Sequence, residues 1–88
     1  MIEADAGKRA NEGFNQLLEE LRPDLLRFAY WLARDRAVAE DVVQETLIRA
    51  WRAQAALKDR AAAKSWLFTI ARREHARLYE RKRLPTVE

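Results

Sequence analysis

The chain of 88 residues contains no cysteine, only two glycines and two prolines, and no long apolar run. The absence of cysteine excludes disulfides, thiolate-bound zinc and cysteine nucleophiles, and it is compatible with an intracellular protein. No stretch approaches the roughly 20 apolar residues that cross a bilayer, and the polar first residues lack the apolar core of a signal peptide. We therefore expect a soluble, cytoplasmic protein that does not act at a membrane.

The composition favours helices. Alanine and leucine are abundant, glycine and proline are scarce, and 35% of the residues are charged, which is typical of amphipathic helices rather than of a sheet or a disordered chain. A chain of this length has room for one small domain and not for a second. The expected fold class is all-α, a small bundle of three to four helices.

The first predicted helix contains a proline. Apolar residues recur every three or four positions from Phe14 to Leu32, as on one face of a helix. Pro23 lies inside this run, cannot donate an amide hydrogen bond, and disfavours helix at the residue before it. We therefore expect this helix to be kinked or broken near Pro23, and we expect residues 1–13 to form a flexible N-terminal segment.

Two further helices are predicted. Asp35 is a plausible N-cap for a helix over residues 36–54, because its carboxylate can accept hydrogen bonds from free amides of the following turn. Residues 55–62 break the apolar period and are predicted as a loop. A last helix is expected over residues 62–83, before Pro85. The apolar stripe of the middle helix comprises Val38, Val42, Val43, Thr46, Leu47, Ala50 and Trp51.

Catalytic chemistry has little support. The only histidine is His75, and there is no Gly-rich phosphate loop or nucleophile motif. Carboxylates cluster at Glu40, Asp41 and Glu45, but a regular helix does not easily supply the further oxygen ligands that Mg²⁺ or Ca²⁺ needs. We expect a polar helix surface there, and we expect no catalytic residue, metal site or cofactor in a protein that is not an enzyme.

Positive charge is concentrated in the last third of the chain. Residues 1–57 hold 8 Lys and Arg against 10 Asp and Glu, a net charge of −2, whereas residues 58–88 hold 9 basic against 4 acidic residues, a net charge of +5. A basic segment on a near-neutral body suggests a polyanionic partner, nucleic acid before an acidic membrane surface. A merely solvated basic tail is the alternative.

The last helix combines arginines with aromatic residues. Arg72, Arg73 and Arg77 can neutralise phosphates, and the faces of Trp66 and Phe68 can stack on unpaired bases. This combination suits single-stranded or melting DNA. Ordinary core packing is the alternative for at least one of the two aromatic residues, and the helical wheel favours Phe68 as the partly buried one.

The middle helix carries an acidic surface. Five residues lie largely away from the apolar stripe: Glu40, Asp41, Gln44, Glu45 and Ile48. Such an acidic rim with one exposed apolar residue can dock a basic partner helix. A helix made soluble by its acids is the alternative interpretation.

Three segments together resemble a known family. AEDVVQETLIRAWRA, residues 39–53, and KSWLFTIARRE, residues 64–74, resemble regions 2.2 and 2.3–2.4 of extracytoplasmic-function (ECF) sigma factors, of the sigma-70 family. FNQLLEELRPDLLRFAYWLARD, residues 14–35, is similar to the preceding regions 1.2 and 2.1. The resemblance covers about residues 14–83, which form the expected region 2 domain.

The resemblance implies a function in transcription initiation. In that family the D-x-V-Q-E helix docks on the clamp coiled coil of the largest RNA polymerase subunit, and the next loop and helix capture bases of the opened promoter −10 element. The implied polymerase-binding residues are Glu40, Asp41, Gln44, Glu45 and Ile48. The implied DNA-binding residues are Leu57, Lys58, Asp59, Arg60, Lys64, Trp66, Arg72, Arg73 and Arg77. An anti-sigma factor is a further implied partner.

The chain departs from the family pattern in three places. Arg73 stands where the family commonly has Asn, which leaves the promoter preference open, and the loop of residues 57–60 lacks the usual aromatic residue and glycine. No segment resembles the domain that reads the −35 element, so residues 84–88 are expected to begin the interdomain linker of an excised domain. The alternative function is a sigma mimic that binds an anti-sigma factor without binding DNA.

Overall fold

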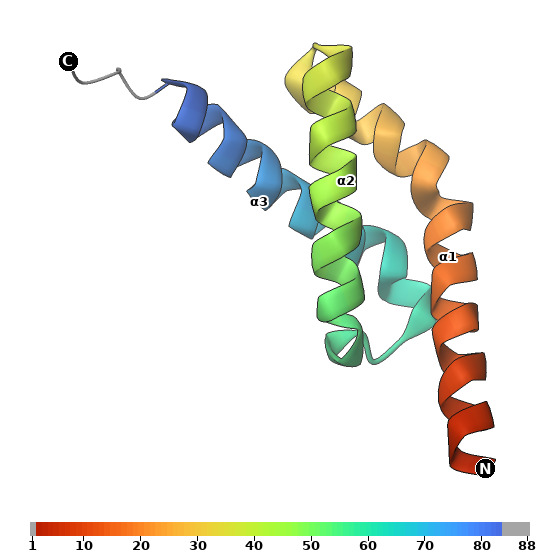
Figure 1. The fold of residues 1–88 in the computed structure, drawn as a ribbon. Helices are drawn as coiled ribbons and strands as arrows, with labels where there is room; N and C mark the ends of the chain where they lie inside the picture. The colour runs from red at the N-terminus through yellow and green to blue at the C-terminus, as the bar shows by residue number, and fades with distance from the viewer. Residues whose placement is uncertain (1, 84–88) are drawn as a thin grey trace.

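The chain folds into three α-helices. The structure, a computed structural model, describes the backbone of residues 2–83 and the side chains of residues 12–81. The helices are α1 (Ile2–Ala33), α2 (Arg36–Arg52) and α3 (Ala63–Arg83), and all three pairs of helices are in contact (Figure 1). The expected all-α bundle is therefore confirmed. None of the described helices is long and apolar enough to span a membrane.

Helix α1 is continuous through Pro23, so the predicted break is wrong. Pro23 is exposed while Leu25 is fully buried, so the hydrogen bond that proline removes faces solvent, where water can satisfy the freed carbonyl. Packing of the apolar face holds the helix together across this position. The other expected outcome, a kink, stays a prediction.

The ends of the predicted domain differ from the helix bounds. Helix α1 begins at Ile2, well before Phe14, and the residues between them include alanine, glutamate, lysine and arginine, which are strong helix formers. The expected division into residues 1–13, 14–83 and 84–88 stays a prediction, and residues 84–88 lie outside the part of the chain that the structure describes.

A tight turn joins α1 to α2. Arg34 adopts a left-handed backbone conformation with φ of 56°, and its amide donates a hydrogen bond of 2.7 Å to the Tyr30 carbonyl. This geometry is a common way for a helix to end. The Asp35 carboxylate accepts a hydrogen bond of 3.0 Å from the Val38 amide, so the predicted N-cap is confirmed.

All three helices contribute to the core. Leu25 of α1, Val42 and Val43 of α2, and Leu67 of α3 are almost completely buried. The predicted apolar stripe of α2 is confirmed, except that Trp51 at its end is 37% exposed and contacts the ring of Phe14 at a centroid distance of 5.9 Å.

The segment between α2 and α3 is partly ordered by short 3₁₀ turns. Helix α2 ends at Arg52, two residues before the predicted end, and the turns η1 (Gln54–Ala56) and η2 (Arg60–Ala62) follow. The turn η1 begins one residue before the predicted loop, and η2 lies within it. Helix α3 begins at Ala63, one residue after the predicted start. Figure 1 shows the blue C-terminal part of α3 extending beyond α2 and away from α1. This part of α3 is therefore accessible from most sides.

Candidate functional site

The predicted polymerase-binding residues share one side of α2. Glu40, Asp41, Gln44 and Glu45 are exposed, and Ile48 is 38% exposed, because Val42, Val43 and Thr46 occupy the buried side of the helix. We call these five exposed residues the acidic face. The structure brings them together as one surface.

A groove separates the acidic face from α3. Asp41, Gln44 and Glu45 line one wall, and Glu74, Leu78 and Arg81 of α3 line the other. Glu74 is the exception among the charged residues, because its side chain is only 6% exposed. Glu74 lies two turns after the buried Leu67 on the inner side of α3, and nothing close to it in the sequence indicates what compensates a buried carboxylate.

Arg49 of α2 compensates the buried carboxylate of Glu74. Its Nε lies 2.8 Å from Oε2 of Glu74 and 3.7 Å from Oε1 of Glu45. The Nε–H of Arg49 has no aligned acceptor, so the contact with Glu74 is an ion pair rather than a hydrogen bond. Nη1 of Arg77 lies 3.9 Å from the same Glu74 oxygen. A chain of four charged side chains therefore joins the acidic face to the basic helix.

The arginines of α3 are exposed. The side chains of Arg72, Arg73 and Arg77 all lie on the surface of α3. Among the described residues, Arg72 and Arg73 make no hydrogen bond or ion pair, whereas Arg77 lies near Glu74. Arg72 and Arg73 thus have guanidinium groups that are available for phosphates.

The loop residues are engaged in the fold to different degrees. Leu57 is half-buried and packs against the core, and the Asp59 carboxylate accepts a hydrogen bond of 3.0 Å from the Ala61 amide at the start of η2. Arg60 Nη2 donates a hydrogen bond of 3.4 Å to the Gly13 carbonyl, which ties the loop to α1. Lys58 is exposed. The loop is therefore stabilised by Leu57, Asp59 and Arg60, in addition to any contact that these residues make with DNA.

Trp66 and Phe68 both pack inside the bundle. Phe68 stacks on Phe28 with ring centroids 4.3 Å apart and an interplanar angle of 10°, and Trp66 contacts Phe14 edge-on at 6.3 Å. Both residues are half-buried and packed against the core. The packing interpretation is therefore correct for both, and Trp66 can offer a base only the part of its ring that stays exposed.

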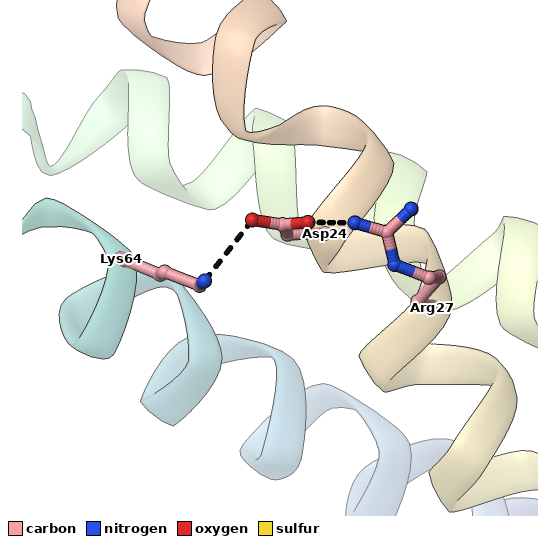
Figure 2. A network of polar contacts seen from close by, with 3 residues as sticks. All are labelled: Asp24, Arg27 and Lys64. Carbon is pink, nitrogen blue, oxygen red and sulfur yellow. Dashed lines mark hydrogen bonds and ion pairs between the residues drawn. The ribbon is translucent and has the colours of Figure 1, made fainter.

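Lys64, a predicted DNA-binding residue, is paired with an acid of α1. Its Nζ lies 3.0 Å from Asp24 Oδ2, and Arg27 pairs with the other oxygen of the same carboxylate (Figure 2). The hydrogen bond to Lys64 and the positive charge of Lys64 lower the pKa of Asp24, with a smaller contribution from Arg27. Part of the charge of Lys64 is therefore already neutralised within the fold.

We expect Asp24→Asn to strengthen binding of single-stranded DNA, because the substitution releases the charge of Lys64 for a phosphate. One additional phosphate contact steepens the dependence of log affinity on log salt by about 0.7 for a single strand. The measurement is fluorescence anisotropy of a labelled oligonucleotide at several salt concentrations. An unchanged affinity and salt slope would show that Lys64 does not contact the strand.

The same variant should lose folding stability in a pH-dependent way. The folded-state pKa of Asp24 is lowered, so its ion pairs stabilise the fold above the unfolded pKa of about 3.9, and this contribution is lost as the pH falls through the folded pKa. The difference in melting temperature between the two proteins should therefore be present at pH 7, shrink below about pH 4 and disappear once the pH lies below the lowered folded-state pKa. A constant difference down to acidic pH would contradict this assignment.

Two exposed aromatic residues near the end of α1 were not predicted from the sequence. Tyr30 is 52% exposed and Trp31 is 64% exposed. Neighbouring side chains on a helix point about 100° apart, so Tyr30 and Trp31 point away from the side on which Ala29 is buried. This spacing could have indicated an exposed aromatic surface. Asp24 and Arg49 were missed as well, because Lys64 and Glu74, with which they pair, lie on another helix.

Comparison with known proteins identifies relatives of one kind. The chain is 51% identical over 57 residues to the ECF RNA polymerase sigma factor SigL of Mycobacterium tuberculosis, a match that covers 64% of this chain and 32% of the relative. It is 33% identical over 61 residues to the ECF RNA polymerase sigma factor SigX of Bacillus subtilis, covering 69% of this chain and 31% of that protein. The chain thus spans about a third of the length of these relatives.

No solved structure matches the chain significantly. The family profile agrees with the two relatives above. The profile of sigma-70 region 2 matches residues 17–84, which is most of the chain and includes the acidic face, the loop and the arginines of α3. By this match, and by its similarity to ECF sigma factors, the chain belongs to the sigma-70 region 2 family.

Proposed function

We propose that this domain binds the RNA polymerase core through the acidic face of α2 and holds the opened promoter −10 strand with the loop and α3. The observation that carries the proposal is the separation of two exposed surfaces of opposite charge on two helices of a sigma-70 region 2 domain. A sigma factor domain is not an enzyme, so binding energy alone must support promoter opening.

The acidic face is suited to a basic partner helix. Asp41, Gln44 and Glu45 supply acceptors and donors around the exposed Ile48, and the surface lies next to a groove. The clamp coiled coil of the largest polymerase subunit is the proposed partner. Complementary charge at such an interface accelerates association and fixes the register of the two surfaces.

The arginines of α3 are suited to a DNA strand. Arg72 and Arg73 are exposed, and neutralising phosphates releases counterions, which favours binding at low salt. Flipping a base out of a duplex costs a few kcal/mol, and base and phosphate contacts must offset that cost. A strand that is already open binds without this cost, so the domain should prefer single-stranded DNA to a duplex.

The direct test is anisotropy of fluorescent single-stranded −10 oligonucleotides and matched duplexes, measured from low to moderate salt. The proposal expects binding to the single strand that weakens steeply with salt, and a preference for −10 sequence when the domain is bound to polymerase. Absence of binding at low salt contradicts strand holding. Binding that ignores sequence even in the polymerase-bound state contradicts recognition of the −10 element.

Docking is tested separately with Asp41→Lys. Reversing a charge at the centre of the acidic face should weaken binding to core polymerase at least about tenfold, because like charges across an interface repel. Glu20→Lys is the matched control, since Glu20 is an exposed acid on α1 outside the acidic face. Surface plasmon resonance with immobilised core enzyme measures both. Equal losses of polymerase affinity in the two variants would exclude the acidic face as the docking site.

An anti-sigma factor is the proposed regulatory partner. Such a protein inhibits by covering the acidic face or α3, so it should compete with core polymerase or with the oligonucleotide. A chain that binds an anti-sigma factor but neither polymerase nor DNA would be the sigma mimic instead.

A further inference from the structure

An aromatic stack at the interface of α1 and α3 ends in an exposed ring. Phe28 of α1 stacks on Phe68 of α3, with centroids 4.3 Å apart and an interplanar angle of 10°. Trp31 stacks on Phe28 at 6.2 Å and 19°. Phe28 and Phe68 pack against the core, so the inner part of the stack is held in place. Trp31 is 64% exposed and forms its outer member.

Exposure of this extent is unusual for tryptophan, whose large ring is mostly buried in folded proteins. Tyr30 beside it is 52% exposed, so two large aromatic rings lie at the surface within one turn of α1. Neighbouring exposed aromatic residues mark binding surfaces more often than isolated ones do. The ring of Trp31 is therefore a candidate contact for a flat partner group.

The interhelical pairs show which side of α3 contacts this part of α1. Asp24 pairs with Lys64, and Phe28 stacks on Phe68, so Lys64 and Phe68 mark that side of α3. Arg72 follows Phe68 by four residues and is exposed, so it continues the same side of α3 beyond the stack.

Positive side chains also flank Trp31 on its own helix. Arg27 lies one turn before it, and Arg34 donates a hydrogen bond of 3.4 Å from Nε to the Trp31 carbonyl. Nearby acids are already engaged: Asp24 pairs with Lys64 and Arg27, and the carboxylate of Asp35 caps α2. Arg34 and Arg72 have no acidic partner among the described side chains. The charge around the ring therefore favours a polyanion over an acidic or neutral protein surface.

We propose that Trp31 is a stacking platform for an unpaired base of single-stranded DNA, with Arg34 and Arg72 placed to contact the flanking phosphates. This inference rests on the proposed function, and it adds a second base contact outside the loop and α3. Stacking on an aromatic ring tolerates any base, because every base has a π face. Trp31 should therefore increase affinity without contributing sequence preference.

The test compares Trp31→Ala, Trp31→Phe and Trp51→Ala in anisotropy titrations with a fluorescent single-stranded oligonucleotide. Trp31→Ala should weaken binding about tenfold, which is the usual scale for loss of one stacked base. Trp31→Phe should keep most of the affinity, because phenylalanine retains a π face. Trp51→Ala is the matched control, since Trp51 is an exposed tryptophan that contacts Phe14 elsewhere on the bundle. Thermal unfolding of each variant checks that it is folded.

A second measurement reports contact directly. In a chain with Trp51→Phe and Trp66→Phe, Trp31 is the only tryptophan, and its emission should be quenched when the oligonucleotide binds. The inference is overturned if Trp31→Ala binds DNA with normal affinity while a variant of the α3 arginines loses binding. This outcome leaves the proposed function intact. A wild-type chain that binds no oligonucleotide overturns both. Normal DNA affinity with lost polymerase affinity assigns Trp31 to a protein partner and also overturns the inference.

Discussion

A chain carrying Arg72→Glu and Arg73→Glu is expected to lose at least about 25-fold in affinity for single-stranded DNA at 0.1 M salt. Each phosphate contact to a single strand releases about 0.7 of a counterion, which is worth roughly fivefold at this salt concentration. Two lost contacts therefore multiply to about 25-fold, and repulsion between the new carboxylates and the strand adds to the loss. Anisotropy titrations from 0.05 to about 0.3 M salt measure the change.

The choice of these two arginines follows from their surroundings. Both are exposed and make no ion pair among the described side chains, so their reversal should leave the fold intact. Arg77 is less suitable, because a glutamate there would lie close to the buried carboxylate of Glu74.

A matched control separates a local effect from total charge. Arg22→Glu with Arg52→Glu changes the net charge by the same amount on exposed positions of α1 and α2. Salt screens charges over about 10 Å at 0.1 M, so this control should reduce affinity only slightly. Equal losses in both double variants would mean that the strand responds to overall charge rather than to α3. Binding of the α3 variant to core polymerase should be unchanged.

Glu74→Gln is expected to lower the free energy of unfolding by about 1–3 kcal/mol. The substitution removes the negative partner of Arg49, whose Nε lies 2.8 Å from a carboxylate that is only 6% exposed. Arg49 itself is 42% exposed, so water can solvate part of its charge, and the cost should fall below that of a fully buried broken pair. Urea-induced unfolding followed by circular dichroism measures the difference.

Two comparisons test whether this loss of stability comes from the Arg49–Glu74 ion pair. Glu80→Gln alters an exposed acid of the same helix and should change stability by less than about 0.5 kcal/mol. Replacing Arg49 and Glu74 together by methionine should restore much of the loss, because an apolar pair leaves no unpaired buried charge. If Glu74→Gln is as stable as Glu80→Gln, the ion pair does not stabilise the contact between α2 and α3.

The helices and their buried faces were largely predictable from local patterns. The N-cap Asp35 follows from capping chemistry, and the stripe around Val42 and Val43 follows from helical periodicity. The break at Pro23 was predicted wrongly, because a local rule about proline was outweighed by burial of Leu25 on the opposite side of the same helix.

The candidate surfaces were predictable to a lesser extent. The sequence identified which residues of α2 and α3 are charged and exposed, and the resemblance assigned them to polymerase and DNA. It did not indicate that Trp66 packs on Phe14 or that Asp59 and Arg60 hold the loop. These side chains were predicted as strand contacts, and their roles toward DNA stay predictions.

The sequence by itself determined that the chain is helical, where α2 and α3 lie, and that its last third is basic, because these properties depend on residues close together along the chain. Only the tertiary structure decided that Lys64 pairs with Asp24, that Arg49 compensates Glu74, and that Trp31 extends a stack through Phe28 to Phe68. The Lys64–Asp24, Arg49–Glu74 and Phe28–Phe68 pairs join different helices, and their distances depend on how each helix is rotated and placed against the others. Many weak packing contacts set that arrangement together, so no single segment encodes it.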